Sequence, residues 1–218
     1  MSFNWQVALE ILPALFGGLW VTIQVSLLAF ALAAILGLFM ALGRRSDNKW
    51  LSEPLGALIE FVRSTPLLVQ LFFFFYVLPR YGVRMPAFVL GTIALGLHYG
   101  TYASEVYRAG INAVGRGQWE AARALNFSPA RTWTGIILPQ AIPPMIPALG
   151  NYLVAIFKES AQLSAITVTE LMATASIIGA QTFRYLESIT LVGALYFLIS
   201  YPSSLVVRRL EARYARRA

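Results

Sequence analysis

Long apolar runs without charge dominate the pattern of this chain. No charged residue occurs between Pro13 and Leu42. An α-helix needs about 20 apolar residues to cross the hydrocarbon core of a bilayer, so this run is long enough to span with some tilt. A cleaved signal peptide is the competing interpretation of an N-terminal apolar run. Residues 1–12 contain no Lys or Arg, whereas a signal peptide begins with a basic region, so we expect a retained membrane span.

The same pattern recurs along the chain and predicts an all-α integral membrane protein. Pro and Gly interrupt several of the runs, and no linker or tandem repeat divides the sequence. We therefore expect one transmembrane domain over residues 1–218. The moderately apolar stretch 167–186 is expected to lie at the membrane surface or to dip partly into it. About five membrane spans are predicted, at residues 13–42, 55–78, 86–107, 139–166 and 188–207.

Composition agrees with a membrane protein and excludes other classes. The 218 residues are 58% hydrophobic and 12% charged, against about 45–50% and about 25% in soluble domains. The chain has no cysteine, which excludes a disulfide framework and a thiolate metal site. The net charge is +7, but the basic residues occur in short segments between apolar runs, so we expect no binding to nucleic acid.

The distribution of Lys and Arg predicts the orientation of the chain. Segments 43–54, 114–138 and 208–218 together hold eleven Lys and Arg residues. The connections on the other side hold only Arg80, Arg84 and Arg184. Cytoplasmic loops carry the excess of Lys and Arg in membrane proteins. The N-terminus is therefore predicted outside the cell and the C-terminus in the cytoplasm.

The predicted cytoplasmic segment 115–138 is patterned in a way that ordinary loops are not. Residues Glu120–Asn126 are rich in Ala and Leu, which favour a helix, and Asn126 tolerates the left-handed conformation that ends one. Ser128 and Pro129 then suit the cap and first position of a second short helix. This predicts a compact knob below the membrane, either an amphipathic element on the headgroups or a docking element for a cytoplasmic partner.

Several motifs resemble one family. Glu120-Ala-Ala, then Leu125, Pro139 and Ile142-Pro143-Pro144, is similar to the EAA signature of bacterial ABC importer permeases. The similarity covers about residues 14–209, and its one visible departure is Asn126, where the family usually has Gly. Further motifs resemble the polar-amino-acid branch, which includes ectoine-type permeases: Arg63-Ser-Thr-Pro-Leu-Leu-Val-Gln70, Tyr102-Ala-Ser-Glu105, Arg108-Ala-Gly110 and Lys158-Glu-Ser160.

The resemblance implies a type I ABC importer permease fold in the bacterial inner membrane, and alternating access driven by separate subunits. The implied partners are a cytoplasmic ABC ATPase dimer, an extracytoplasmic solute-binding protein and a second permease, either the same chain or a similar one. ATP and Mg²⁺ would be bound by the ATPase. The phosphate-loop pattern G-x-x-x-x-G-K-[ST] does not occur, so we expect no enzymatic activity or cofactor in this chain. The implied coupling residues are Glu120, Ala121, Ala122, Leu125 and Asn126.

Ionisable residues inside spans indicate where a solute binds, because they are costly in a bilayer. Arg63 beside the helix-breaking Pro66 suits bidentate capture of a carboxylate, and an internal pair with Glu60 is the equal alternative. Glu105 and Arg108 are favoured as a structural pair, and His98 as a hydrogen-bonded packing residue. The candidate solute-binding residues are Arg63, Gln70, Tyr102 and Glu159.

Two other classes remain as alternatives. An ATP-independent channel or secondary transporter would also carry polar residues in its spans, but it would not need the EAA-like knob. A membrane-embedded enzyme would require a convergent nucleophile or metal set, and no such spacing is present. The predicted function is the membrane-spanning subunit of an importer for a small zwitterion such as an amino acid or an ectoine-like solute.

Overall fold

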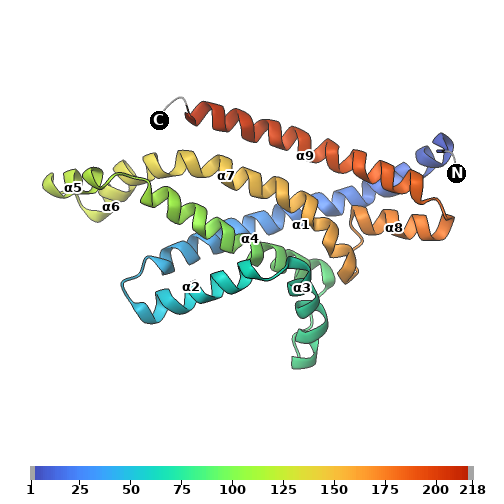
Figure 1. Cartoon of the computed structure of the whole chain (residues 1–218), viewed down its shortest axis with the longest axis horizontal. Helices are drawn as coiled ribbons and strands as arrows, with labels where there is room; N and C mark the ends of the chain where they lie inside the picture. Colours follow the sequence, from blue (N-terminus) through green and yellow to red (C-terminus); the bar gives the residue numbers. More distant parts are fainter. Residues whose placement is uncertain (1–2, 216–218) are drawn as a thin grey trace.

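The computed structural model describes residues 3–215, and all its regular elements are helical (Figure 1). The longest helices are α1, α4, α7 and α9, and the others are short or bent. The elements are α1 (Trp5–Arg44), α2 (Lys49–Ser64), α3 (Leu67–Phe72), η1 (Phe73–Val77), η2 (Leu78–Tyr81), α4 (Ala87–Asn112), α5 (Arg116–Ala124), α6 (Pro129–Thr132), η3 (Trp133–Ile137), α7 (Leu138–Glu159), η4 (Ser160–Ile166), α8 (Leu171–Thr182) and α9 (Tyr185–Ala215).

Three helical stretches are long and apolar enough to cross a membrane, namely Trp5–Arg44, Pro129–Ile166 and Tyr185–Tyr214. A fourth follows if α2 and the segment Leu67–Tyr81 together make one bent span. Helix α4 has 26 residues and so a length of about 39 Å at 1.5 Å per residue. It carries His98, Glu105 and Arg108, so it is more polar than α1 along its length. The total of five spans therefore stays a prediction.

The second predicted span, residues 55–78, is wrong as a single helix. Helix α2 ends at Ser64, and α2 and the Leu67–Tyr81 segment meet at 105°. Thr65 is extended, with φ −104° and ψ 138°, because the ring of Pro66 disfavours the helical conformation in the residue before it. In Figure 1 the α3 arm accordingly projects away from the long helices.

The region after the first short helix of the knob also differs from the prediction. Residues Pro129–Thr132 form α6, but the chain continues through the π-helical turn η3 directly into α7. The second helix of the knob is thus the beginning of the fourth predicted span. Pro139 lies in the first turn of α7, where its missing N–H is tolerated. The stretch 167–186 contains a three-turn helix, α8, which lies against α1 and α9.

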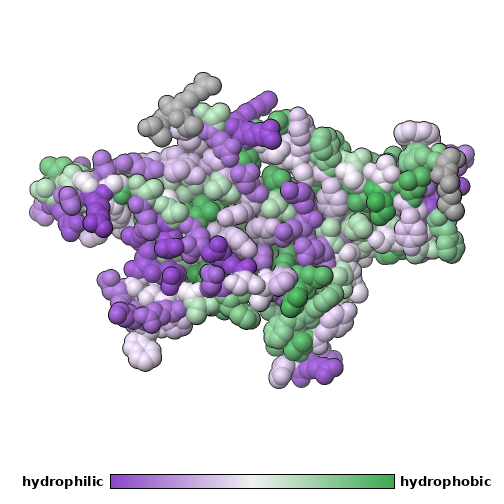
Figure 2. Space-filling model, in the orientation of Figure 1, coloured by the Kyte–Doolittle hydropathy of each residue, from purple (hydrophilic) through white to green (hydrophobic). Residues whose placement is uncertain are grey.

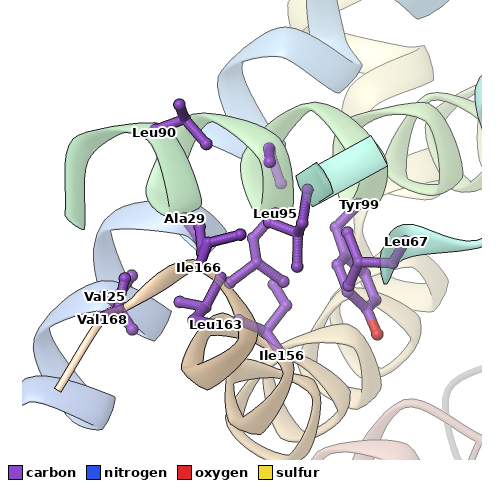
Figure 3. Packing of buried hydrophobic residues seen from close by; sticks show 13 residues of the cluster. Val25, Ala29, Leu67, Leu90, Leu95, Tyr99, Ile156, Leu163, Ile166 and Val168 are labelled. Atoms are coloured by element: carbon purple, nitrogen blue, oxygen red, sulfur yellow. The ribbon is translucent and has the colours of Figure 1, made fainter. Parts of the chain in front are cut away.

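The largest buried cluster joins α1, α4 and the α7–η4 region (Figure 3). Val25 and Ala29 of α1 share this cluster with Leu95 of α4, and Ile156 and Leu163 enter it from α7 and η4. Small residues let α1 and α4 approach closely. A Cβ atom on Gly37 would lie 2.7 Å from the Cβ of Ala103. This close packing holds α4 as the central helix that carries most of the polar residues described below.

Candidate functional site

Arg63 lies in the last turn of α2, just before the break. Its side chain is 34% exposed, and its Nη1 is 3.9 Å from Glu60 Oε2, on a side chain that is 73% exposed. The guanidinium carbon lies 5.1 Å from the centre of the Tyr102 ring on α4. The pair with Glu60 is therefore present but long and open to its surroundings, and such exposed pairs contribute little stability. The guanidinium is held mainly over Tyr102.

Gln70 of α3 caps the end of α2 across the helix break. Its Nε2 donates to the carbonyl oxygens of Val62, at 2.7 Å, and of Thr65, at 3.1 Å. Its Oε1 lies 3.2 Å from Nδ1 of His98. The amide thus satisfies carbonyl groups that the end of a helix leaves without partners. His98 is largely buried and hydrogen-bonded, as the sequence predicts.

Aromatic rings line the space between α4 and α7. The centroid of the Tyr102 ring lies 5.3 Å from that of His98, 6.1 Å from that of Tyr99 and 6.0 Å from that of Tyr152. Tyr152 belongs to α7 and also lies 5.9 Å from Tyr99. On α4, Tyr102 follows Tyr99 by three residues and His98 by four, so both rings are its neighbours on one side of that helix. Together they form an aromatic cluster beside the guanidinium of Arg63.

Both signs of charge surround this cluster. Arg63 lies over Tyr102, Glu105 follows Tyr102 by three residues on α4, and Glu159 is the last residue of α7. Glu105 also accepts a hydrogen bond of 3.2 Å from Nε of Arg108, which confirms the predicted pair. Figure 2 shows a hydrophilic band over the α2–α4 region of this face, with hydrophobic surface around α3.

The structure therefore brings Arg63, Gln70 and Tyr102 together, although they come from three helices. Glu159 is the last residue of α7, the helix that also supplies Tyr152 to the cluster. Lys158 beside it is exposed while Glu159 is half-buried, as expected for neighbours on one helix. Sequence reasoning missed Tyr99 and Tyr152. The spacing of Tyr99 to Tyr102 is a usable signal, but nothing local marks Tyr152.

The knob has the turn chemistry that the sequence predicts. Asn126 follows α5 in the left-handed conformation with φ 53°. The Ser128 hydroxyl accepts a hydrogen bond of 3.4 Å from the backbone N–H of Arg131. Trp119 of α5 meets Trp133 of η3 edge to face, with ring centroids 5.2 Å apart. These contacts fold α5 back against the beginning of the α7 run.

The outer face of the knob is exposed to solvent. Glu120, Ala121 and Asn126 are exposed, and Leu125 is 66% exposed although it is apolar. Ala122 is instead fully buried, so it supports the helix from within. A depression of about 640 Å³ is lined by residues of α5, the α5–α6 connection, α6 and η3: Arg116, Trp119, Glu120, Arg123, Phe127, Pro129, Thr132 and Trp133.

A second groove runs between the end of α4, the Pro-rich turns of α7 and α9. Its volume is about 1000 Å³. Pro143, Pro144 and Pro147 line it, and Asn151 Nδ2 donates to Glu211 Oε1 across it at 3.3 Å. Within the described residues 3–215, no group of three or more His, Cys, Asp or Glu side chains could hold a metal ion.

Comparisons with known proteins cover almost the whole chain. A sequence profile for the family described as "Binding-protein-dependent transport system inner membrane component" matches residues 33–216. The "Probable amino-acid ABC transporter permease protein y4tG" of Sinorhizobium fredii is 49% identical over 96% of this chain and 91% of its own length. The "L-cystine transport system permease protein TcyB" of Bacillus subtilis is 36% identical over 94% of this chain and 89% of its own length.

Solved structures show the same architecture. A chain in a crystal structure of an amino acid ABC transporter with histidines superposes with a TM-score of 0.91. It is 37% identical, and the match covers 98% of this chain and 100% of that one. A chain of the inward-facing methionine transporter MetNI superposes with a TM-score of 0.70 at 19% identity, and the match covers 92% of this chain and 98% of that one. At that identity the likeness concerns the fold alone.

Proposed function

This chain belongs to the family of binding-protein-dependent transport system inner membrane components, and from that premise we propose that it imports amino acids in an ATP-driven complex. Its all-helical fold is that of the type I ABC importer permeases, as the sequence motifs predicted. It is a membrane translocation subunit of an ABC transporter. The amino-acid permeases among its relatives favour that class of solute over ectoine-like compounds.

The observation that carries the proposed solute class is the position of Arg63 at the helix break. Its guanidinium lies over Tyr102 and is only weakly paired with Glu60. The guanidinium can therefore donate two parallel hydrogen bonds to a solute carboxylate. Glu159 at the end of α7 suits the ammonium group of a zwitterion, whereas Glu105 is already engaged by Arg108. Gln70 shapes the site, because its amide already serves the backbone and His98.

The proposed complex contains an ATPase dimer, a solute-binding protein and a second permease, as membership of the family implies. We place the ATPase contact on the exposed residues of the knob, with Glu120 and Leu125 at its centre. ATPase closure would move α5, and the spans would then reorient as rigid bodies. This requires the knob in the cytoplasm, which is the predicted orientation.

The test is solute uptake in proteoliposomes that hold this chain, its ATPase and its binding protein. Arg63→Ala is expected to raise the apparent KM for the solute about tenfold to a hundredfold, because a charge-assisted hydrogen bond contributes about 1.5–3 kcal/mol. Arg63→Lys should lose part of this, since Lys cannot bind bidentately. Arg84→Lys, an exposed arginine in the η2–α4 connection, is the matched control.

Glu120→Lys tests the coupling site in the same vesicles. Uptake and binding-protein-stimulated ATP hydrolysis should both collapse while the isolated ATPase stays active. Uptake that continues without ATP would refute the importer and favour a channel or secondary transporter. Full coupling in the Glu120 variant would refute the knob as the ATPase contact.

A further inference from the structure

We propose that Arg45 is a positioning residue that connects α1 to the coupling knob, an inference that rests on the proposed importer function. Arg45 caps the C-terminal end of α1. Its Nη1 donates to Asn112 Oδ1, on the last residue of α4, at 2.7 Å. Its guanidinium carbon also lies 5.8 Å from the centre of the Trp133 ring in η3. One side chain therefore contacts the end of a long helix and the base of the knob.

Trp133 is the residue through which this contact reaches the exposed face of the knob. Its ring meets Trp119, which directly precedes Glu120 in α5. Both tryptophans pack against one small buried cluster formed by Ile111, Val114, Ile137, Ala141 and Met145. The direction in which α5 points thus depends on the position of Trp133.

Chain connectivity explains why a contact from α1 matters. Helix α4 is joined to α5 by residues 113–115, and α7 follows η3 without a break. Movement of the knob therefore reaches α4 and α7 through the backbone. Helix α1 has no such connection, yet it packs along α4 in the main core. Arg45 adds a direct contact from the end of α1 to the base of the knob at Trp133, so α1 can respond to the knob through this side chain as well as through its packing on α4.

The neighbouring Arg44 makes the assignment to Arg45 specific. Its Nη1 donates to the carbonyl oxygen of Ser52 at 2.9 Å, and its guanidinium covers Gly56 of α2. Arg44 is therefore used inside the turn between α1 and α2. Both arginines contribute equally to the excess of positive charge on this side, so charge alone does not distinguish them. Their contacts do.

The first readout is the position of the knob. The chain contains no cysteine, so Asp47→Cys in the α1–α2 turn and Ala124→Cys, at an exposed position at the end of α5, give a specific pair of spin labels. In the assembled complex, Arg45→Ala should broaden or shift the distance distribution between them. Arg44→Ala, the matched control, should leave it unchanged. Arg45→Lys should restore part of it, because Lys keeps the charge but lacks the guanidinium fork that reaches both Asn112 and Trp133.

The second readout is uptake per ATP hydrolysed by the same complexes without labels. Arg45→Ala should lower this ratio about threefold to thirtyfold, the effect of one contact in a coupling network, with the KM for solute unchanged. The proposal is overturned if the label distances or the uptake ratio stay at the wild-type values, or if Arg44→Ala changes them equally. A wild-type complex without ATP-driven uptake would instead refute the proposed function together with the coupling role.

Discussion

Glu170 is the residue whose removal should destabilise the fold most clearly. It is fully buried at the beginning of α8, and it is not paired with a cation among the described residues. Its carboxylate accepts hydrogen bonds from the N–H groups of Ala173, at 2.7 Å, and Met172, at 2.9 Å. The Tyr196 hydroxyl of α9 donates to it at 2.7 Å, and the Thr22 hydroxyl of α1 lies at 3.4 Å. One carboxylate therefore joins α1, α8 and α9.

The cost of Glu170→Ala follows from these partners. Loss of the helix cap contributes about 1 kcal/mol. A buried Tyr196 hydroxyl without a partner costs about 1–3 kcal/mol. The long contact to Thr22 adds little. With the void left by the side chain, the free energy of unfolding should fall by about 4 kcal/mol, which corresponds to about 8–16 °C in Tm for a chain of this size.

Thermal unfolding of the detergent-solubilised protein, followed by tryptophan fluorescence, measures this shift. Glu10→Ala removes an exposed carboxylate from α1 and should leave the Tm within about 2 °C of the wild type, since surface substitutions have small effects. Glu170→Gln keeps the shape but turns an N–H donor toward other donors, so about half of the loss is expected. A Glu170→Ala protein with the wild-type Tm would refute the reasoning.

Three further predictions use the same fold. Gly37→Leu should lower the Tm by several degrees, because a side chain there meets Ala103 and the carbonyl oxygen of Gly100, 2.8 Å from a Cβ atom, and overpacking costs about 1–3 kcal/mol. Asn126→Gly should keep or increase amide-exchange protection in α5, and Asn126→Val should reduce it. The φ of residue 126 is positive, and glycine adopts that conformation readily whereas a β-branched residue does not. Gln70→Leu should speed amide exchange at the end of α2, because the carbonyl groups of Val62 and Thr65 lose the side-chain donor that caps them.

Much of the fold was predictable from the sequence. The run from Pro13 to Leu42 lies within α1, and the predicted boundary near Ile166 matches the end of η4. Transfer of a segment into a bilayer depends on its own composition, so no neighbour is needed to predict it. The same holds for the turn at Asn126 and the cap at Ser128, because their hydrogen bonds lie within a few residues.

The candidate site was predictable only in part. Arg63 and Tyr102 stand out because polar residues in apolar runs are costly. Their meeting depends on the break at Thr65–Pro66. The proline indicates that the helix is disturbed, but the 105° angle follows from packing of the α3 segment against the core. Tyr152 could not be found, because it reaches the cluster from α7, fifty residues farther along the chain.

The sequence by itself determined the class of protein, most of the helices and the family, since these depend on local composition and motifs. The tertiary structure decided what each polar side chain contacts. Arg44 and Arg45 are adjacent and chemically identical, yet one serves the α1–α2 turn and the other reaches α4 and the knob. Such contacts join residues distant in sequence, so they exist only once the helices have packed.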